Sequence, residues 1–251
     1  MEKFLGLPPL ASAHGGQLDH LIGIVHWLML SLFLVWGTFF IYTLIRFRAK
    51  RNPSADYVGV KSHMSSYLEI GVALFEAFLL IGFSIPLWAT RVNEFPDAKN
   101  ATVVRVVAEQ FSWNIHYPGP DGVFGRTSAS LVTSDNPLGL DHSDPAAKDD
   151  ITTINQLNLP VDKPVIVHLT TKDVLHSFNL PVMRVKQDAV PGMNIPVWFT
   201  PVKIGQYEIA CAQLCGLGHY RMRGYLNIMS QSDYTQWLAD QAKEAAAAAA
   251  N

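Results

Sequence analysis

Two long apolar runs near the start of the chain dominate its hydrophobic pattern. Residues 21–47 are almost continuously apolar, and a second run extends from residue 67 to residue 89. Both runs are longer than the about 20 residues that a membrane-spanning helix needs, and the first is too long for a buried core helix. The pattern therefore predicts a hairpin of two transmembrane helices within residues 18–95.

The polar segment around and between these runs is strongly basic. It carries Arg46, Arg48, Lys50, Arg51 and Lys61. Basic loops tend to stay on the cytoplasmic side of a membrane. We therefore expect a multi-pass protein of the cell membrane with this loop in the cytoplasm, and with the N-terminus and everything after residue 91 on the periplasmic side.

Residues 1–17 form a separate N-terminal segment. Its sequence Ala11-Ser12-Ala13 resembles the small-residue cleavage site of a secretory signal. The apolar run before that site is short, however, and Pro8 and Pro9 interrupt it. A remnant of a signal sequence and an ordinary N-terminus outside the membrane therefore both fit this segment.

The second apolar run contains two carboxylates, Glu69 and Glu76. They are seven residues apart, so they lie on one face of a helix. A carboxylate in mid-membrane costs about 2.5–3.5 kcal/mol and normally faces protein or water. Glu69 either sits at the membrane surface or belongs to a proton-handling face against a partner. His26, alone in the first run, is better explained as a polar contact than as a metal ligand.

From residue 96 onward the pattern changes to short strand-like runs separated by turn residues. The runs are rich in β-branched and aromatic residues, and their spacing predicts an antiparallel all-β sandwich or barrel over residues 96–230. Residues 131–150, rich in Asp, Pro and Gly, predict a long surface excursion. Residues 233–249 predict a peripheral helix in a C-terminal tail, 231–251. The strand-like runs are residues 102–117, 164–171, 174–180, 195–200, 206–210 and 222–229.

Composition narrows the possible functions. Hydrophobic residues make up 49% of the chain and charged residues 16%, which agrees with membrane segments. The net charge of −2 and the absence of a basic stripe argue against a nucleic-acid partner. Two cysteines are too few for a disulfide framework.

Residues 211–222 concentrate soft metal ligands. Both cysteines of the chain, Cys211 and Cys215, lie here with three residues between them, and His219 and Met222 follow. Thiolates, a thioether and imidazole together suit copper. His176, upstream in another strand-like run, can supply a second imidazole.

Several kinds of site are compatible with these residues. A disulfide would close a very small loop and leave His219 and Met222 without a role. A zinc site has no use for methionine, and a mononuclear blue-copper site uses only one cysteine. Two thiolates and two imidazoles can instead hold two copper ions, with each sulfur bridging both. A membrane-anchored copper-delivery protein and a non-catalytic anchor with a disulfide remain as alternatives.

Nearly the whole chain resembles subunit II of a bacterial haem–copper cytochrome c oxidase. The resemblance covers the two apolar runs and the segments 176–178 (HSF), 186–193 (KQDAVPGM) and 211–222 (CAQLCGLGHYRM). It implies a cupredoxin-like Greek-key domain over residues 96–230 that holds a binuclear copper centre, CuA. The ligands implied are bridging Cys211 and Cys215, terminal His176 and His219, weakly bound Met222, and the backbone carbonyl of Gln213.

The resemblance also implies a role in respiration. Electrons from a cytochrome c would pass through the copper centre to haem in a separate subunit I, where oxygen becomes water and protons are translocated. Subunit III and membrane lipid would be further partners. The sequence has no Cys-x-x-Cys-His motif, so we expect the cytochrome to be a separate protein. Quinol oxidase subunits lack the copper ligands, which argues against quinol as the direct donor.

Two positions depart from the family pattern. Gln213 stands where the family has a glutamate whose carboxylate also binds magnesium, so magnesium is not expected here. Phe111 replaces the first tryptophan of the family's electron-accepting aromatic patch, Gln-Trp-x-Trp. Together with Trp113 it would form this patch, and simple packing within the sandwich is the alternative.

The resemblance gives a role to one of the two intramembrane carboxylates. Counted back from Pro86, Glu69 falls on the family's acidic residue at the mouth of a proton pathway into subunit I. Glu76 falls where the family has an apolar residue or proline, and it has no family role.

Overall fold

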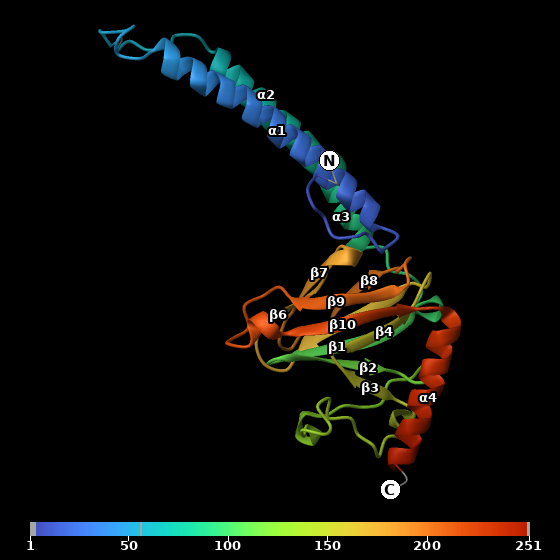
Figure 1. Ribbon diagram of the computed structural model, residues 1–251. Coiled ribbons are helices and arrows are strands. Elements are labelled where there is room, and N and C mark those ends of the chain that lie inside the picture. Colours follow the sequence, from blue (N-terminus) through green and yellow to red (C-terminus); the bar gives the residue numbers. More distant parts are fainter. Residues whose placement is uncertain (1–3, 56, 250–251) are drawn as a thin grey trace. The chain divides into compact units, whose positions relative to one another are not determined.

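The computed structural model describes residues 4–55 and 57–249 (Figure 1). The outermost parts of the predicted N-terminal segment and C-terminal tail, residues 1–3 and 250–251, lie outside the described residues. The chain forms two compact units. One comprises Gln17–Thr90 with the residues before Pro8, and the other comprises Pro8–Gly16 with the chain from Arg91 onward.

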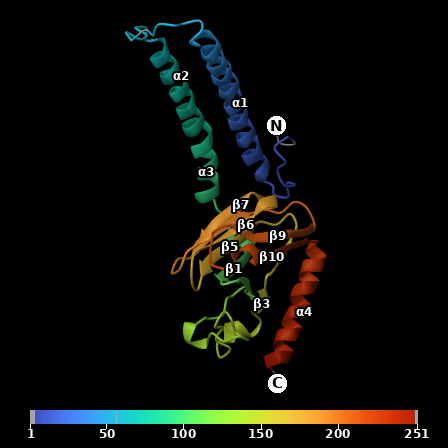
Figure 2. The same ribbon diagram turned by 60° about the vertical axis from the view of Figure 1, so that its left-hand side comes forward.

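The first unit is built from two long helices joined by residues 47–63 (Figure 2). Helix α1 spans Gly15–Arg46, and the second helix runs without a break from Met64 to Val92. Both are long and apolar enough to cross a membrane, as the sequence predicts, and most of their side chains are exposed in this chain.

The second helix changes geometry along its length. It consists of α2 (Met64–Leu79), a π-helical turn (Leu80–Ser84) and α3 (Ile85–Val92). Pro86 explains the widened turn, because proline has no N–H and its ring clashes with the carbonyl four residues earlier. One π-helical turn accommodates the proline, and the helix continues as α3 to Val92.

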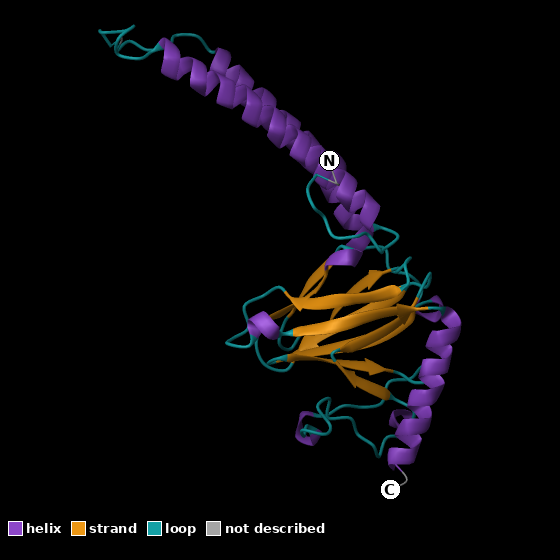
Figure 3. Ribbon diagram, in the orientation of Figure 1, coloured by secondary structure: helices purple, strands orange, loops and turns teal. Residues whose placement is uncertain are grey.

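The second unit is a sandwich of two five-stranded sheets (Figure 3). The strand order is β3-β2-β1-β5-β8 in one sheet and β4-β10-β9-β6-β7 in the other. The predicted class, a helical pair plus an all-β sandwich, is confirmed. The strands are β1 (Thr102–Glu109), β2 (Ser112–Tyr117), β3 (Ile151–Ile154), β4 (Gln156–Pro160), β5 (Val165–Thr171), β6 (His176–Leu180), β7 (Val185–Ala189), β8 (Ile195–Phe199), β9 (Gly205–Cys211) and β10 (Arg223–Met229).

The strand pairing differs from the antiparallel arrangement that the sequence suggests. β1 pairs in parallel with β5, and β4 pairs in parallel with β10. The reason is that the chain crosses to the other sheet after β3 and returns after β4, so β5 enters the first sheet beside β1 in the same direction. Such crossings between sheets are typical of Greek-key connections.

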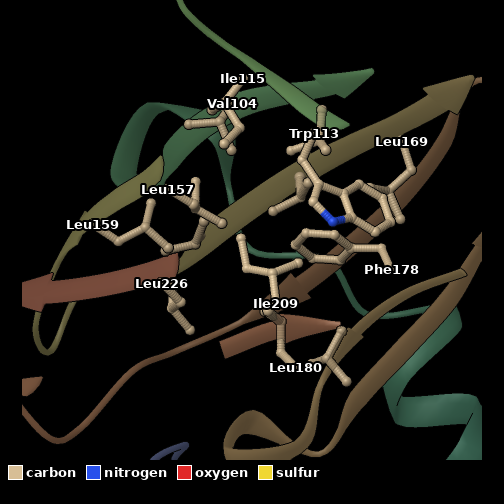
Figure 4. Packing of buried hydrophobic residues seen from close by; sticks show 14 of the residues in the cluster. Val104, Trp113, Ile115, Leu157, Leu159, Leu169, Phe178, Leu180, Ile209 and Leu226 are labelled. Carbon is tan, nitrogen blue, oxygen red and sulfur yellow. The ribbon is translucent and has the colours of Figure 1, made fainter. Parts of the chain in front are cut away.

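The core lies between the two sheets. Along β1 every second side chain is buried, which is the period-2 pattern of a strand with one covered face. Trp113 from β2 and Phe178 from β6 meet edge to face, with ring centroids 5.5 Å apart (Figure 4). Ala11 from the N-terminal segment also joins this core, and its N–H donates to the Val182 carbonyl at 2.8 Å.

The long connection between β2 and β3, residues 118–150, has no strands of its own. It contains two short 3₁₀ turns, Ala129–Leu131 and Pro145–Lys148. Asp150 fixes its end, because one carboxylate oxygen accepts the Gly125 N–H at 2.8 Å and lies 2.6 Å from Nε2 of His116. This irregular segment contains the predicted surface excursion, residues 131–150.

The C-terminal helix α4 (Gln231–Ala249) is attached more firmly than the sequence predicts. Tyr234 is buried, and Trp237 packs against Tyr117 of β2 with ring centroids 5.1 Å apart. The sequence interpretation rested on the alanine run, whereas the contact is made by Tyr234 and Trp237, which lie before that run.

Candidate metal centre

The predicted metal ligands come from the ends of two neighbouring strands. His176 opens β6 and Cys211 closes β9, and these strands pair through Phe178 and Cys211. The Ala212 N–H also donates to the Ser177 carbonyl at 3.0 Å. The sheet therefore holds the upstream histidine beside the start of the loop that carries the other ligands.

The loop of residues 212–222 returns the chain from β9 to β10. Its two ends are joined, because the Cys211 N–H donates to the Met222 carbonyl at 3.2 Å. A short 3₁₀ turn, His219–Arg221, directs the second imidazole back toward the cysteines. Cys215 and Met222 are buried, whereas Leu217 at the tip is 97% exposed.

All of the predicted donor atoms gather within one cluster. The sulfur atoms of Cys211 and Cys215 are 3.8 Å apart, so both thiols are free. Nδ1 of His176 lies 3.9 Å from the Cys211 sulfur, and Nδ1 of His219 lies 3.6 Å from the Cys215 sulfur. The Met222 sulfur is 3.8 Å from that of Cys215, and the Gln213 carbonyl oxygen is 3.2 Å from that of Cys211.

Two residues that the sequence did not single out support this cluster. Asp173 accepts the Nε2–H of His176 at 2.9 Å, which turns Nδ1 toward the sulfurs. Its other oxygen accepts the Gln110 N–H at 2.7 Å, and the Gln110 side chain donates to the Cys215 carbonyl at 2.6 Å. The only sequence signal for these supporting hydrogen bonds is the spacing of Asp173, which lies three residues before His176.

The two thiols have unequal affinities for protons. At Cys211, burial opposes ionisation, but hydrogen bonds with His176, with the backbone of Ser177 and Gln213 and with His219 together outweigh burial and lower the pKa to about 6. At Cys215, burial and the charge of Cys211 raise the pKa to about 11. Hydrogen bonds with Cys211 and Asp173 likewise outweigh burial at His176 and raise its pKa. The pair therefore carries about one negative charge near neutral pH.

The two aromatic residues of the predicted patch occupy different depths. Phe111 is half-buried, and its ring covers Gly216 and Gly218 of the metal-ligand loop so closely that a Cβ on Gly218 would collide with it. Trp113 is fully buried, which excludes direct contact with a partner. Its ring centroid lies 6.3 Å from that of His176. Only Phe111 can form part of an exposed contact surface.

The predicted carboxylates belong to the first unit. Glu69 and Glu76 are both exposed in α2, two helical turns apart. Neither carboxylate has a hydrogen bond or an ion pair among the described residues. Pro86, from which Glu69 was placed, lies in α3 after the π-helical turn.

A β-sandwich whose strand ends gather two free thiols, two imidazoles and a thioether defines a domain with a donor set for copper. The protein-family model for cytochrome c oxidase subunit II, periplasmic domain, matches residues 102–229. The chain belongs to the cytochrome c oxidase subunit II family, which confirms the predicted family.

Relatives of this family match almost the whole chain. The alternative cytochrome c oxidase subunit 2 of Bradyrhizobium diazoefficiens is 34% identical over 93% of this chain and 83% of its own length. Cytochrome c oxidase subunit 2 of Cereibacter sphaeroides is 28% identical over 93% of this chain and 78% of its own length. Among solved structures, the periplasmic domain of subunit II of cytochrome oxidase from Bradyrhizobium japonicum is 26% identical, covers 59% of this chain and 97% of that chain, and has a TM-score of 0.44.

Proposed function

We propose that the chain is the electron-accepting subunit of a membrane-bound cytochrome c oxidase and that its cluster holds a binuclear copper centre. Cys211 and Cys215 would hold the two ions through their thiolates, and His176 and His219 would each supply an imidazole ligand. Met222 and the backbone carbonyl of Gln213 complete the set as weak ligands. The observation that carries this proposal is the 3.8 Å separation of the two sulfurs, with an imidazole beside each.

The sulfur separation fits two bridging thiolates. It is far longer than a disulfide bond of about 2.05 Å. It is also shorter than two metal–thiolate bonds of about 2.3 Å placed end to end. The two sulfurs would therefore be close enough for both thiolates to bind the same ions. Each imidazole nitrogen lies near a different sulfur, so the two imidazoles would be available as separate terminal ligands.

The surrounding protein suits electron transfer. Bound copper would supply one-electron redox chemistry at this position. The ligands stand on paired strand ends, and Asp173 and Gln110 hold His176 and the Cys215 backbone in place. Because strand pairing and hydrogen bonds within the protein fix these groups, little needs to rearrange when the charge changes.

The half-buried ring of Phe111 marks the side from which electrons would arrive. It lies over the metal-ligand loop, and Trp113 behind it packs against His176. A separate cytochrome c would dock over Phe111, and the electrons would continue to haem in subunit I. Subunit III and lipid would be further neighbours, and Glu69 would take up protons for subunit I.

The membrane arrangement follows from the same role. α1 and the helix from Met64 to Val92 would cross the cell membrane, with the basic loop in the cytoplasm and the sandwich in the periplasm.

Magnesium is not part of the proposed centre. The exposed Gln213 side chain offers a neutral amide, whereas magnesium is normally held by carboxylates.

Copper analysis of the full complex tests this function. We expect two copper ions per chain and the purple absorption of a mixed-valence thiolate centre. One colourless copper(I) ion per chain would instead indicate a copper-delivery protein. A metal-free chain with a disulfide between Cys211 and Cys215 would indicate a non-catalytic anchor. Either of these results would refute the electron-accepting role.

A further inference from the structure

Glu76 lies close to the middle of the second helix. The apolar helix spans Met64–Val92, and its central residue is Phe78. Glu76 is two residues from that centre, or about 3 Å along the axis at about 1.5 Å per residue. Glu69 is nine residues from the centre, or about 14 Å, which is near the edge of a hydrocarbon layer about 30 Å thick. The two carboxylates therefore face different surroundings in a membrane.

Nothing in the described part of the chain compensates Glu76. Its side chain is exposed, and no described residue forms a hydrogen bond or an ion pair with its carboxylate. An acidic side chain at the centre of a membrane helix costs about 2.5–3.5 kcal/mol when it faces lipid. Polar groups at this depth are normally satisfied by a neighbouring helix. The compensating group must then come from another chain.

We infer that Glu76 is a mid-membrane anchor that accepts a hydrogen bond from a donor side chain on a partner membrane subunit. The face of α2 around Glu76 is the surface that packs against this partner. The donor is a hydroxyl, amide or basic group at the same depth. The inference rests on the proposed function in one respect, namely that the chain spans the membrane within a multisubunit complex.

The helix geometry defines which residues share this face. Leu80 lies one turn after Glu76, because its N–H donates to the Glu76 carbonyl, and it is 54% exposed. Leu74 is two residues before Glu76, which places it on the opposite side of the helix, and it is 66% exposed. These two leucines provide a matched pair for probing the two faces.

A set of variants in the full chain separates anchoring from simple hydrophobicity. The tagged chain is purified from native membranes in mild detergent, and haem is measured per chain. Glu76→Leu should reduce the haem per chain by about tenfold or more, which corresponds to about 1.4 kcal/mol. Glu76→Gln should stay within about twofold of the native chain, because an amide oxygen still accepts the hydrogen bond.

The double variant Glu76→Leu/Leu74→Glu keeps the composition of the helix but moves the carboxylate to the other face. It should lose haem as Glu76→Leu does. Recovery of haem in this variant, or full retention in Glu76→Leu, would overturn the inference. Copper per chain in the same samples tests the proposed function separately, because the metal ligands lie outside this helix.

A cross-linking experiment keeps Glu76 itself intact. A photoreactive side chain in place of Leu80 should cross-link to a membrane subunit of the complex, whereas the same side chain in place of Leu74 should react mainly with lipid. Equal cross-linking from both positions, or cross-linking from position 74 alone, would show that the face around Glu76 is not the contact surface.

Discussion

The metal-ligand cluster and the carboxylates of α2 are held in opposite ways. Around the cluster, strand pairing, a closed loop and the hydrogen bonds of Asp173 and Gln110 set the positions of the donor atoms. Glu69 and Glu76 have no such contacts among the described residues. The difference shows that the metal-ligand cluster is assembled within one chain, whereas the two carboxylates are exposed and have no partner among the described residues.

This contrast predicts how each region responds to mutation. A change in the cluster should alter the properties of the isolated chain. A change in α2 should be visible only in the assembled complex.

The largest effect is expected from Cys215→Ser. Removing one of the two thiolates that we propose as bridging ligands leaves too few soft ligands for two copper ions. We expect loss of the binuclear spectrum and at least about a hundredfold slower electron transfer from cytochrome c, measured by absorption and stopped-flow kinetics. An unchanged binuclear spectrum would contradict the bridging role. Ser177→Ala, next to His176 but outside the donor set, serves as the control.

A smaller effect is expected from Phe111→Ala. Aromatic residues at the centre of a protein interface often contribute about 2 kcal/mol, which corresponds to roughly thirtyfold in affinity. Electron transfer from the donor should slow by about this factor, while copper content stays the same. Phe111→Leu keeps an apolar cover over Gly218 and shows how much of the effect belongs to the ring. Equal losses of copper and of electron transfer would point to folding instead.

Glu69→Gln should act only in the assembled oxidase. If this carboxylate takes up protons, its loss should slow oxygen consumption by about tenfold, which is less than the about 10²–10⁴-fold typical of an acid or base that acts on the reacting group itself. The copper spectrum should not change. Glu94→Gln, an exposed acidic residue after α3, is the matched control. Normal turnover of the Glu69 variant would remove the proton-uptake role.

A further effect concerns the stability of the sandwich and its dependence on pH. His14 is buried beside Trp198, with ring centroids 6.2 Å apart. Burial, assisted by the charge of Arg91, lowers the pKa of His14 to about 4. Between pH 6.5 and 4, His14 binds a proton in the unfolded chain but stays neutral in the folded chain. The free energy of unfolding therefore falls as the pH decreases through this window.

His14→Gln should remove this contribution, which is on the order of 2 kcal/mol after allowance for solvent screening. Thermal unfolding of the full chain in detergent at several pH values measures it. The native chain should lose more stability than the variant between pH 6.5 and 4. Parallel curves would show that His14 is not the responsible group.

The sequence predicted those features that have a local signature. The apolar runs, the turn-bounded strands and the residue types in the segment 211–222 are all visible without a structure. β3 and β4 had no such signature, because they are short and meet at Asn155, whose φ of 58° is unusual. The sequence also did not predict that residues 102–117 divide into β1 and β2 at Gln110 and Phe111, because no glycine or proline marks that turn.

Other features depend on contacts between distant segments. The parallel pairing of β1 with β5 follows from where the chain crosses between sheets, which local patterns do not record. The support from Asp173 and Gln110 arises because separate loops meet beside the cluster. The depth of Trp113 likewise depends on the second sheet, since Phe178 of β6 covers its ring.

The position of the loop 212–222 has a consequence for the order of events when the protein is made. Its tip is open to solvent, with Leu217 97% and Tyr220 85% exposed, while the sandwich core is closed by apolar side chains from both sheets. We therefore expect the domain to fold first and to receive its copper afterwards, through the open tip. Biogenesis would then have two separate checkpoints, and a cell short of copper would accumulate folded subunits that wait for metal rather than misfolded ones.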